Sequence, residues 1–308
     1  MMRAMGPLQT PPLILGGNVF GWTADEATSF AVLDAFADGG GVMIDTADVY
    51  SAWIPGHKGG ESESVIGRWL KRTPHRARML VATKVGMMGS LSASAIVDAC
   101  DASLARLGVD RIDLYYAHKD DAGTPLEETL TAFDGLIRAG KVRAIGASNY
   151  EAPRLEEALA VSAANGLAAF SVLQPWFNPV ERGKYEGALQ DLCVEHHIAV
   201  APYYSLANGF LTGKYRTQAD LAKSVRGSRN REYVDSDRGK SVLAELDAIA
   251  ADMGATLGQI ALAWTAAQPG IVAPIASATS VEQVAELVGA MRLTLTAERV
   301  ARLDRASA

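Results

Sequence analysis

Residues 79–118 read MLVATKVGMMGSLSASAIVDACDASLARLGVDRIDLYYAH and contain two apolar runs separated by a longer amphipathic stretch. The runs at about Met79–Thr83 and Ile112–Ala117 have the length and composition of buried β-strands. Between them, a helix that ends at Gly108 is predicted by one apolar face. That face consists of Ile96, Val97, Cys100, Leu104 and Leu107. The segment therefore predicts a β–α–β unit with parallel strands.

The same alternation of apolar runs and amphipathic stretches continues on both sides of this unit. A helix is expected to begin at a capping box in Thr124–Glu127 and to end at Gly140, and another to run from about Glu151 to Gly166. Eight βα units predict an α/β fold, the (β/α)8 TIM barrel, with long loops at the C-terminal face of the strands. The six further strands are expected near Leu13–Gly16, Val42–Asp45, Val142–Ala147, Ala169–Gln174, Ile198–Tyr203 and Ile271–Ile275.

Length and composition limit the class of protein. The 308 residues fit either one barrel or two average domains. We favour a single domain over residues 1–308, because no low-complexity linker and no internal repeat divides the chain. Hydrophobic residues make up 49% of the chain and charged residues 21%, which predicts a large core and excludes a disordered protein.

Charge and cysteine content exclude several partners. The net charge of −6 argues against nucleic acid as the main partner. No stretch approaches the roughly 18 apolar residues of a membrane span, and the first residues lack the apolar centre of a secretory signal. Cys100 and Cys193 form no metal or redox motif by spacing, and the histidines show no metal-ligand arrangement. We expect a cytoplasmic protein with no membrane and no metal partner, and the oligomeric state stays open.

Residues 205–240 are longer than a compact βα connection requires, and such loops are usually functional or disordered. From Lys214 to Lys240 there are eight Lys or Arg and four Asp or Glu, a local charge of +4. This basic segment (Lys214–Lys240) is either a solvated surface excursion or a mobile flap that meets phosphate groups. The run GFLTGKY at 209–215 lacks the spacing of a Walker A loop, and no G-x-G-x-x-G follows a strand.

The active site of a (β/α)8 barrel lies at the carboxyl ends of its strands. Singly, the residues there have structural explanations: Asp45 as a loop cap, Lys84 as a solvated cation and His118 as a hydrogen-bonded rim histidine. Together they form an acid–base set. The side chains that follow three neighbouring strands are Asp45, Tyr50, Lys84 and His118.

This set of residues suits protonation of an oxygen. Tyrosine has a pKa near 10, which a nearby ammonium lowers by favouring the phenolate. We expect Asp45 to hold Lys84, and Lys84 to lower the pKa of Tyr50. His118 would orient a substrate carbonyl or pass a proton. Because the set holds no nucleophile, the attacking group is expected to be a hydride from a cofactor.

The chain resembles the aldo-keto reductase family through nearly all of its length. Eight motifs stand in the family's order and at its spacing. They are DTADVY at 45–50, GGESESVIGRWL at 59–70, VATK at 81–84, DLYYAHKDD at 113–121, GKVRAIGASNY at 140–150, LQPWFN at 173–178, PYYSLANGFLTGKY at 202–215 and PIASATSVEQVAE at 274–286. The resemblance implies reduction of aldehydes or ketones, or the reverse oxidation of alcohols, with NADPH.

The resemblance also implies individual roles. Tyr50 would be the general acid of a catalytic tetrad completed by Asp45, Lys84 and His118. Tyr203 would stack on the nicotinamide ring, although its neighbour Tyr204 is an alternative. The other implied cofactor contacts are Ser148, Asn149 and Gln174 at the carboxamide, Leu206, Gly209 and Lys214 at the pyrophosphate, and Ala278, Thr279, Gln283 and Glu286 at the adenosine phosphate and adenine.

Two positions bear on the choice between NADPH and NADH. Gln283 stands where some relatives have arginine, and Leu287 replaces a common asparagine. Gln283 also fits a capping box with Ser280, a purely structural role. We expect NADPH, with NADH as the less favoured cofactor. Positive charge for its 2′-phosphate is available from Lys214, Arg216 and the arginines of 226–231.

Aromatic residues on the rim loops predict an apolar substrate pocket for a small-molecule carbonyl compound. The candidates are Trp22, Trp53, Trp176 and Phe177, which alternatively cover the barrel end as packing. Trp69 and Trp264 lie on predicted helical faces and are assigned to the core.

A different function is also compatible with the resemblance. Potassium-channel β-subunits share the fold and the tetrad, and act as cofactor-binding sensors or regulatory partners.

Overall fold

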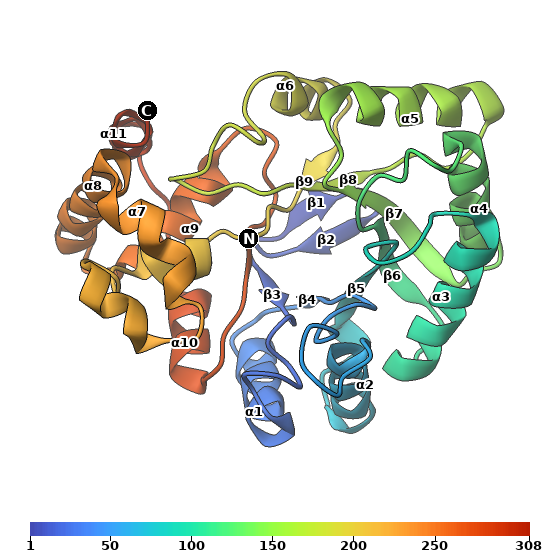
Figure 1. The fold of residues 1–308 in the computed structure, drawn as a ribbon, viewed down its shortest axis with the longest axis horizontal. Coiled ribbons are helices and arrows are strands. Elements are labelled where there is room, and N and C mark those ends of the chain that lie inside the picture. Colours follow the sequence, from blue (N-terminus) through green and yellow to red (C-terminus); the bar gives the residue numbers. More distant parts are fainter.

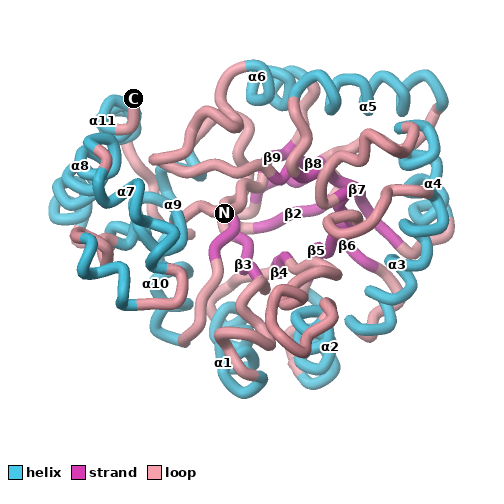
Figure 2. Tube along the Cα trace, in the orientation of Figure 1, coloured by secondary structure: helices cyan, strands magenta, loops and turns pink.

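The computed structural model describes residues 1–308, and its centre is a curled sheet of parallel strands (Figures 1 and 2). The eight strands pair in the order β10-β3-β4-β5-β6-β7-β8-β9. Val272 N donates to Val200 O (2.8 Å), which joins β9 to the segment before β10 and closes the barrel. The predicted (β/α)8 fold is confirmed. The bounds are β3 Ile14–Gly16, β4 Met43–Asp45, β5 Leu80–Val85, β6 Ile112–Ala117, β7 Val142–Ser148, β8 Val172–Gln174, β9 Ala199–Val200 and β10 Ile275–Ala276.

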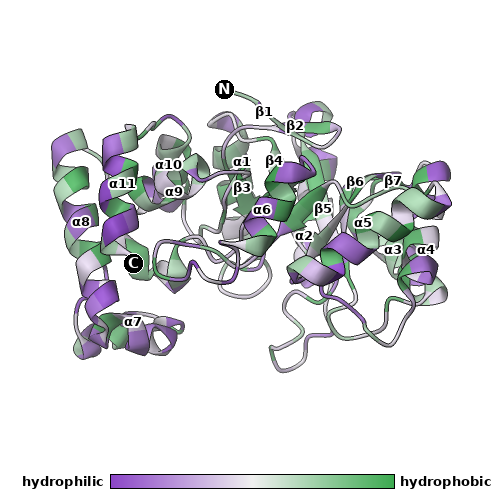
Figure 3. Ribbon diagram, turned by 90° about the horizontal axis from the view of Figure 1, so that it is seen from above, coloured by the Kyte–Doolittle hydropathy of each residue, from purple (hydrophilic) through white to green (hydrophobic).

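Helices surround this barrel and cover its outer face (Figure 2). They are amphipathic, and Figure 3 shows hydrophilic and hydrophobic residues mixed along α8 and α11. No helix combines the length and the apolar character that crossing a membrane requires. The bounds are α1 Glu26–Asp38, α2 Glu61–Arg72, α3 Ala93–Leu107, α4 Leu126–Arg138, α5 Ala152–Asn165, α6 Ala188–Glu195, α7 Arg231–Asp235, α8 Asp237–Met253, α9 Leu257–Ala267, α10 Val281–Ala290 and α11 Ala297–Ala306.

An N-terminal hairpin, absent from the sequence prediction, covers the amino-terminal end of the barrel. Its strands are β1 (Arg3–Met5) and β2 (Leu8–Thr10). Arg143, at the start of β7, donates to Pro7 O at 3.0 Å. Met5 and Leu8 join the buried cluster inside the barrel, together with Ile14, Met43, Ala82, Leu114, Tyr116, Ala144, Val172 and Ala199. The carboxyl end of the barrel is therefore the end available to ligands.

Two local predictions are wrong. Helix α4 begins at Leu126 without a side-chain cap, because Thr124 Oγ1 instead donates to Asp121 at 2.7 Å. Asp121 also accepts from Gly123 N (3.0 Å), so this carboxylate stabilises the turn before the helix. Val97 is 38% exposed and does not belong to the buried face of α3. The end of α3 at a left-handed Gly108 is confirmed, as is the burial of Trp69 and Trp264.

The basic segment is folded rather than irregular. It contains the 3-10 helices η3 (Gln218–Lys223) and η4 (Gly227–Asn230), followed by α7. Buried Tyr215, Leu221 and Val234 pack it against the rest of the molecule. The preceding 3-10 helix η2 (Ala207–Thr212) leads from β9 into this segment. The segment thus forms one wall at the open end of the barrel.

Candidate active site at the carboxyl end of the barrel

Strand alternation explains why polar side chains meet inside the barrel. Side chains two residues apart on a strand point to the same side of the sheet. If residue i points into the barrel, residue i+2 therefore also points into the barrel. Asp45 follows Met43 and Lys84 follows Ala82 in this way, and both Met43 and Ala82 lie in the interior cluster. His118 follows the interior residue Tyr116 by two positions, and Gln174 follows Val172 in the same way. Ser148 lies two such steps after Ala144.

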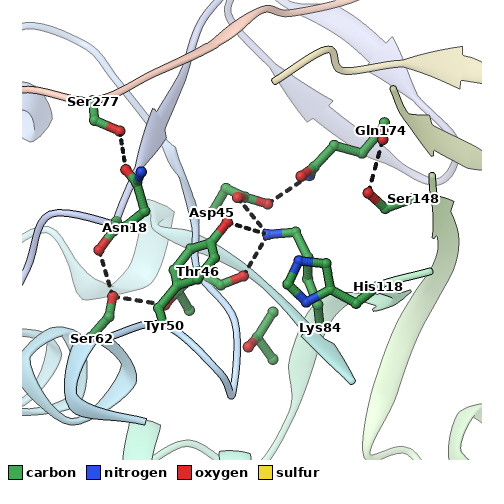
Figure 4. Close-up of polar contacts among 12 residues, drawn as sticks. Asn18, Asp45, Thr46, Tyr50, Ser62, Lys84, His118, Ser148, Gln174 and Ser277 are labelled. Atoms are coloured by element: carbon green, nitrogen blue, oxygen red, sulfur yellow. Dashed lines mark hydrogen bonds and ion pairs between the residues drawn. The ribbon is translucent and has the colours of Figure 1, made fainter. Parts of the chain in front are cut away.

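Lys84 is the centre of the polar group in Figure 4, and its side chain is completely buried. Its Nζ donates to Asp45 Oδ2 at 2.6 Å, to Thr46 O at 2.7 Å and to Tyr50 Oη at 3.2 Å. Gln174 Nε2 donates to the other Asp45 oxygen at 2.8 Å. All three ammonium hydrogens and both carboxylate oxygens therefore have partners, which a buried ion pair requires.

The pKa of Tyr50 differs from the sequence expectation. Burial raises this pKa well above its usual value, and the Asp45 carboxylate raises it further. Burial also lowers the pKa of Lys84, an effect that Asp45 opposes. The expected lowering of the tyrosine pKa by Lys84 is thus wrong for this state, because desolvation of the phenolate outweighs the ammonium. Tyr50 is a neutral phenol at pH 7, the form that donates a proton.

His118 lies beside Tyr50 and is also neutral. The centroids of the two rings are 6.1 Å apart, in an edge-to-face arrangement. Burial lowers the pKa of His118 well below its usual value, and the charge of Lys84 acts in the same direction. Its Nδ1 is buried without a hydrogen-bond partner. A neutral imidazole has one N–H donor, which suits a carbonyl oxygen placed between His118 and Tyr50.

Two cavities open from Tyr50. The cofactor-side cavity, about 480 Å³, extends toward Leu206, Lys214 and Glu286. The rim cavity, about 540 Å³, lies over His118 and Trp176. Six residues line both cavities and mark their boundary: Asn18, Tyr50, Tyr203, Tyr204, Asn208 and Arg226. A ligand in one cavity is therefore in reach of a ligand in the other, with the Tyr50 hydroxyl at their junction.

Comparison with known proteins identifies the family. The sequence model of the Aldo/keto reductase family matches residues 12–308. The chain belongs to the aldo-keto reductase family. It is 32% identical over 291 residues to "Aldo-keto reductase yakc [NADP(+)]" of Schizosaccharomyces pombe, covering 90% of this chain and 82% of that protein.

Two further relatives bear different names. The chain is 33% identical over 288 residues to "Aldo-keto reductase str7" of Strobilurus tenacellus, covering 92% of this chain and 82% of that protein. It is 31% identical over 280 residues to "Probable voltage-gated potassium channel subunit beta" of Arabidopsis thaliana, covering 87% of this chain and 83% of that protein. Relatives of this aldo-keto reductase thus include both reductases and channel subunits by name.

The cofactor-side cavity of this aldo-keto reductase gathers most of the residues assigned to it from sequence. Ser148, Asn149 and Gln174 line the rim cavity instead. Ala278 is buried and lines neither cavity, whereas its neighbours Ser277 and Thr279 line the cofactor-side cavity. A Cβ at Gly209 would lie 2.9 Å from Lys214 Nζ, so glycine keeps space for the lysine. The predicted residues that line this cavity are Tyr203, Leu206, Gly209, Lys214, Thr279, Gln283 and Glu286.

Gln283 has a structural role in addition to its place in this cavity. Its Oε1 accepts from Thr279 N at 2.8 Å, while Ser280 Oγ accepts from Gln283 N at 3.3 Å. The Ser280 side chain thus caps the N-terminus of α10 as predicted. The predicted capping box is not closed, because Gln283 Oε1 accepts from Thr279 N rather than from Ser280 N. Arg216 pairs with Asp247 at 2.7 Å and does not line the cavity. Of the cations considered from sequence, Lys214 and Arg226 do line it.

The rim cavity of this aldo-keto reductase corrects one pocket assignment. Trp22, Trp53 and Trp176 line it, whereas Phe177 is completely buried and stacks on Trp264 with a centroid distance of 5.5 Å. Phe177 lies in the core because consecutive residues leaving β8 face opposite sides. The predicted cofactor residues Ser148, Asn149 and Gln174 also line this cavity.

Tyr203 and Tyr204 are held differently. Tyr203 Oη donates to Asn149 Oδ1 at 2.7 Å, and its ring meets Trp176 edge-on. Tyr204 stacks on Trp176 with a centroid distance of 3.8 Å. Both rings line both cavities, so both remain candidates for the stacking residue.

Several cavity residues were missed from sequence. Asn18 follows β3 and Met87 follows β5, so a search of every strand end would have found them. The others come from loops and from the basic segment, where no strand rule applies. Examples are Asn18, Met87, Asn208 and Tyr233. Arg229 was considered only as a cation for phosphate and not as a residue of the rim cavity.

Proposed function

We propose that this protein reduces aldehyde or ketone carbonyls with NADPH, using Tyr50 as the general acid. The observation that carries the proposal is the buried Lys84, which donates to both Asp45 and Tyr50 at the junction of two cavities. Burying an ion pair costs desolvation free energy, so a buried pair beside a cavity is a candidate for a functional role. The contact of Lys84 with the neutral phenol of Tyr50 provides such a role. NADH is the less favoured cofactor.

The cofactor-side cavity fits a dinucleotide. Gly258 lines it, and a Cβ there would lie 2.9 Å from Glu286 Oε1, so the Glu286 side chain would have to shift. Lys214 and Arg226 supply positive charge for phosphate, and Arg226 Nη2 is a buried donor without a partner. A bound nicotinamide would supply the hydride that the side chains lack. Ser148, Asn149 and Gln174 would hold its carboxamide and Tyr203 its ring.

The residues around Tyr50 then have defined tasks in proton transfer. A carbonyl oxygen at the cavity junction accepts hydrogen bonds from the phenol of Tyr50 and the N–H of neutral His118. As negative charge develops on that oxygen, the phenolic proton moves to it and leaves a phenolate. Lys84 stabilises the phenolate, and Asp45, itself held by Gln174, keeps Lys84 in place.

The activity is tested by mixing the protein with NADPH and a series of activated aldehydes. We expect NADPH oxidation that saturates with aldehyde and produces the alcohol in equal amount. Binding of NADPH, measured by quenching of tryptophan fluorescence, provides a separate readout. Bound NADPH without any oxidation would contradict the reductase proposal.

A second candidate function is a cofactor-binding sensor or regulatory partner. It is favoured by the relatives of Arabidopsis thaliana and Oryza sativa that are named as probable channel β-subunits, each 31% identical to this chain. This function and reduction are separated by the same assay. NADPH binding with turnover supports the reductase, whereas binding without turnover over the whole aldehyde series supports the sensor.

A further inference from the structure

The rim cavity has an unusual balance of charge. Arg226 and Arg229 line it, and none of its sixteen lining residues is Asp or Glu. Neither arginine forms an ion pair within 4.0 Å. The seven aromatic lining residues supply an apolar wall: Trp22, Tyr50, Trp53, Trp176, Tyr203, Tyr204 and Tyr233. The cavity is therefore both aromatic and positively charged.

Arg226 shows that this charge has no internal partner. Its guanidinium lies over the Trp22 ring, 5.0 Å from the centroid, and its Nη2 is buried without a hydrogen-bond partner. Burial lowers the pKa of Arg226, and the charge of Arg229 lowers it further. Burying a cation without a counter-charge costs free energy, and so does an unsatisfied buried donor. The cofactor phosphate assigned to Arg226 above would remove both costs, which leaves Arg229 as the cation of the rim cavity without a counter-charge.

Carboxylates close to the cavity are already engaged. Asp45 accepts from Lys84 and Gln174, at the bottom of the site. Glu181 accepts from Tyr233 Oη at 2.8 Å, behind the cavity wall. Neither is a partner for the two arginines. Arg229 is therefore free to pair with a negatively charged group of a substrate.

We propose that the rim cavity selects aromatic carbonyl compounds that carry a carboxylate, with Arg229 as the specificity-determining residue. The proposal rests on the reductase function above and names its substrate class. The carbonyl would reach Tyr50 and His118, the ring would lie among the tryptophans, and the carboxylate would meet the Arg229 guanidinium. A planar guanidinium matches a carboxylate with two parallel hydrogen bonds.

The test compares two aldehydes that differ in charge, 4-carboxybenzaldehyde and methyl 4-formylbenzoate. We expect the wild-type protein to prefer the carboxylate in kcat/KM, and Arg229→Gln to reduce the ratio of carboxylate to ester by about ten- to hundredfold, the size of a charged hydrogen bond. Added NaCl should reduce the wild-type ratio, because Arg229 is exposed and its charge is screened.

Arg238→Gln is the matched control. It removes the same charge from the same basic segment, but Arg238 is exposed and lines neither cavity. It should keep the wild-type ratio of carboxylate to ester. An equal loss in both variants would overturn the proposal, because it would show an effect of net charge alone. A ratio unchanged by Arg229→Gln would also overturn it.

The outcome for the ester separates this inference from the reductase proposal. Reduction of the ester without preference for the carboxylate contradicts the inference and leaves the reductase proposal standing. If neither aldehyde is reduced, the reductase proposal fails, and calorimetric titration with 4-carboxybenzaldehyde decides the anion site. Binding that Arg229→Gln weakens at least tenfold supports the site, and binding unchanged by the substitution, or none, overturns it.

Discussion

Lys84 at the end of β5 and Arg226 in the basic segment are both shielded cations at the open end of the barrel. Lys84 has three hydrogen-bond acceptors, one of them the Asp45 carboxylate, whereas a buried nitrogen of Arg226 has none. Asp45 and Lys84 come from adjacent strands, and the pairing of Asp45 with Ala82 sets their distance. The ion pair at the strand ends is thus satisfied within the protein, whereas the basic segment carries positive charge that is available to a ligand.

Removal of the proton donor tests the strand-end site most directly. Tyr50→Phe should lower kcat by about 10²–10⁴-fold, the usual contribution of a general acid. NADPH affinity should change little, because the substitution removes only a hydroxyl. The measurements are single-turnover reduction and fluorescence titration with NADPH. Wild-type turnover in this variant would show that another group donates the proton.

Removal of the buried counter-charge tests the pairing itself. Asp45→Asn leaves Lys84 buried without its carboxylate and should reduce the free energy of unfolding by about 3–5 kcal/mol. Urea unfolding monitored by circular dichroism measures this loss. The matched control is Asp247→Asn, which breaks the exposed pair with Arg216 and should cost only about 0–1 kcal/mol. Equal losses would refute the contrast between the two regions.

His118 should make stability depend on pH. Its folded-state pKa lies below the unfolded value near 6.5, so below that pH the unfolded state binds more protons than the folded state. Stability is therefore full above pH 6.5 and falls as the pH decreases toward the folded pKa, by up to about 1.4 kcal/mol per pH unit. His118→Gln should remove this contribution to the pH dependence of the free energy of unfolding. Urea unfolding of the wild type and the variant at a series of pH values measures the difference. Parallel curves would show that His118 is not buried as a neutral group.

Lys214 tests the basic segment. Its ammonium lines the cofactor-side cavity, so Lys214→Gln should weaken binding of NADPH more than that of NADH, by about tenfold in the ratio of Kd values. Fluorescence titrations with both cofactors give the ratio. Equal weakening of the two would assign Lys214 to the pyrophosphate, and unchanged affinities would remove it from the phosphate site.

The success of the sequence predictions follows the same division. The sequence analysis placed Asp45, Lys84 and His118 together because strand ends converge at one face of a barrel, independently of the loop conformations. Phe177 was misassigned because a pocket residue and a core residue stand side by side after β8. Arg229 was not singled out, because charge within a loop does not reveal the direction in which a side chain points.

The amino-acid sequence by itself determined the eight βα units, the end of the barrel that carries the polar residues and which of those residues lie together there. Periodicity and strand ends are local properties, and a closed barrel turns them into a common site. Only the tertiary structure decided that burial raises the pKa of Tyr50 and that Arg226 and Arg229 form no ion pair. Both results depend on desolvation and on contacts between distant segments, which arise only when the whole chain is packed.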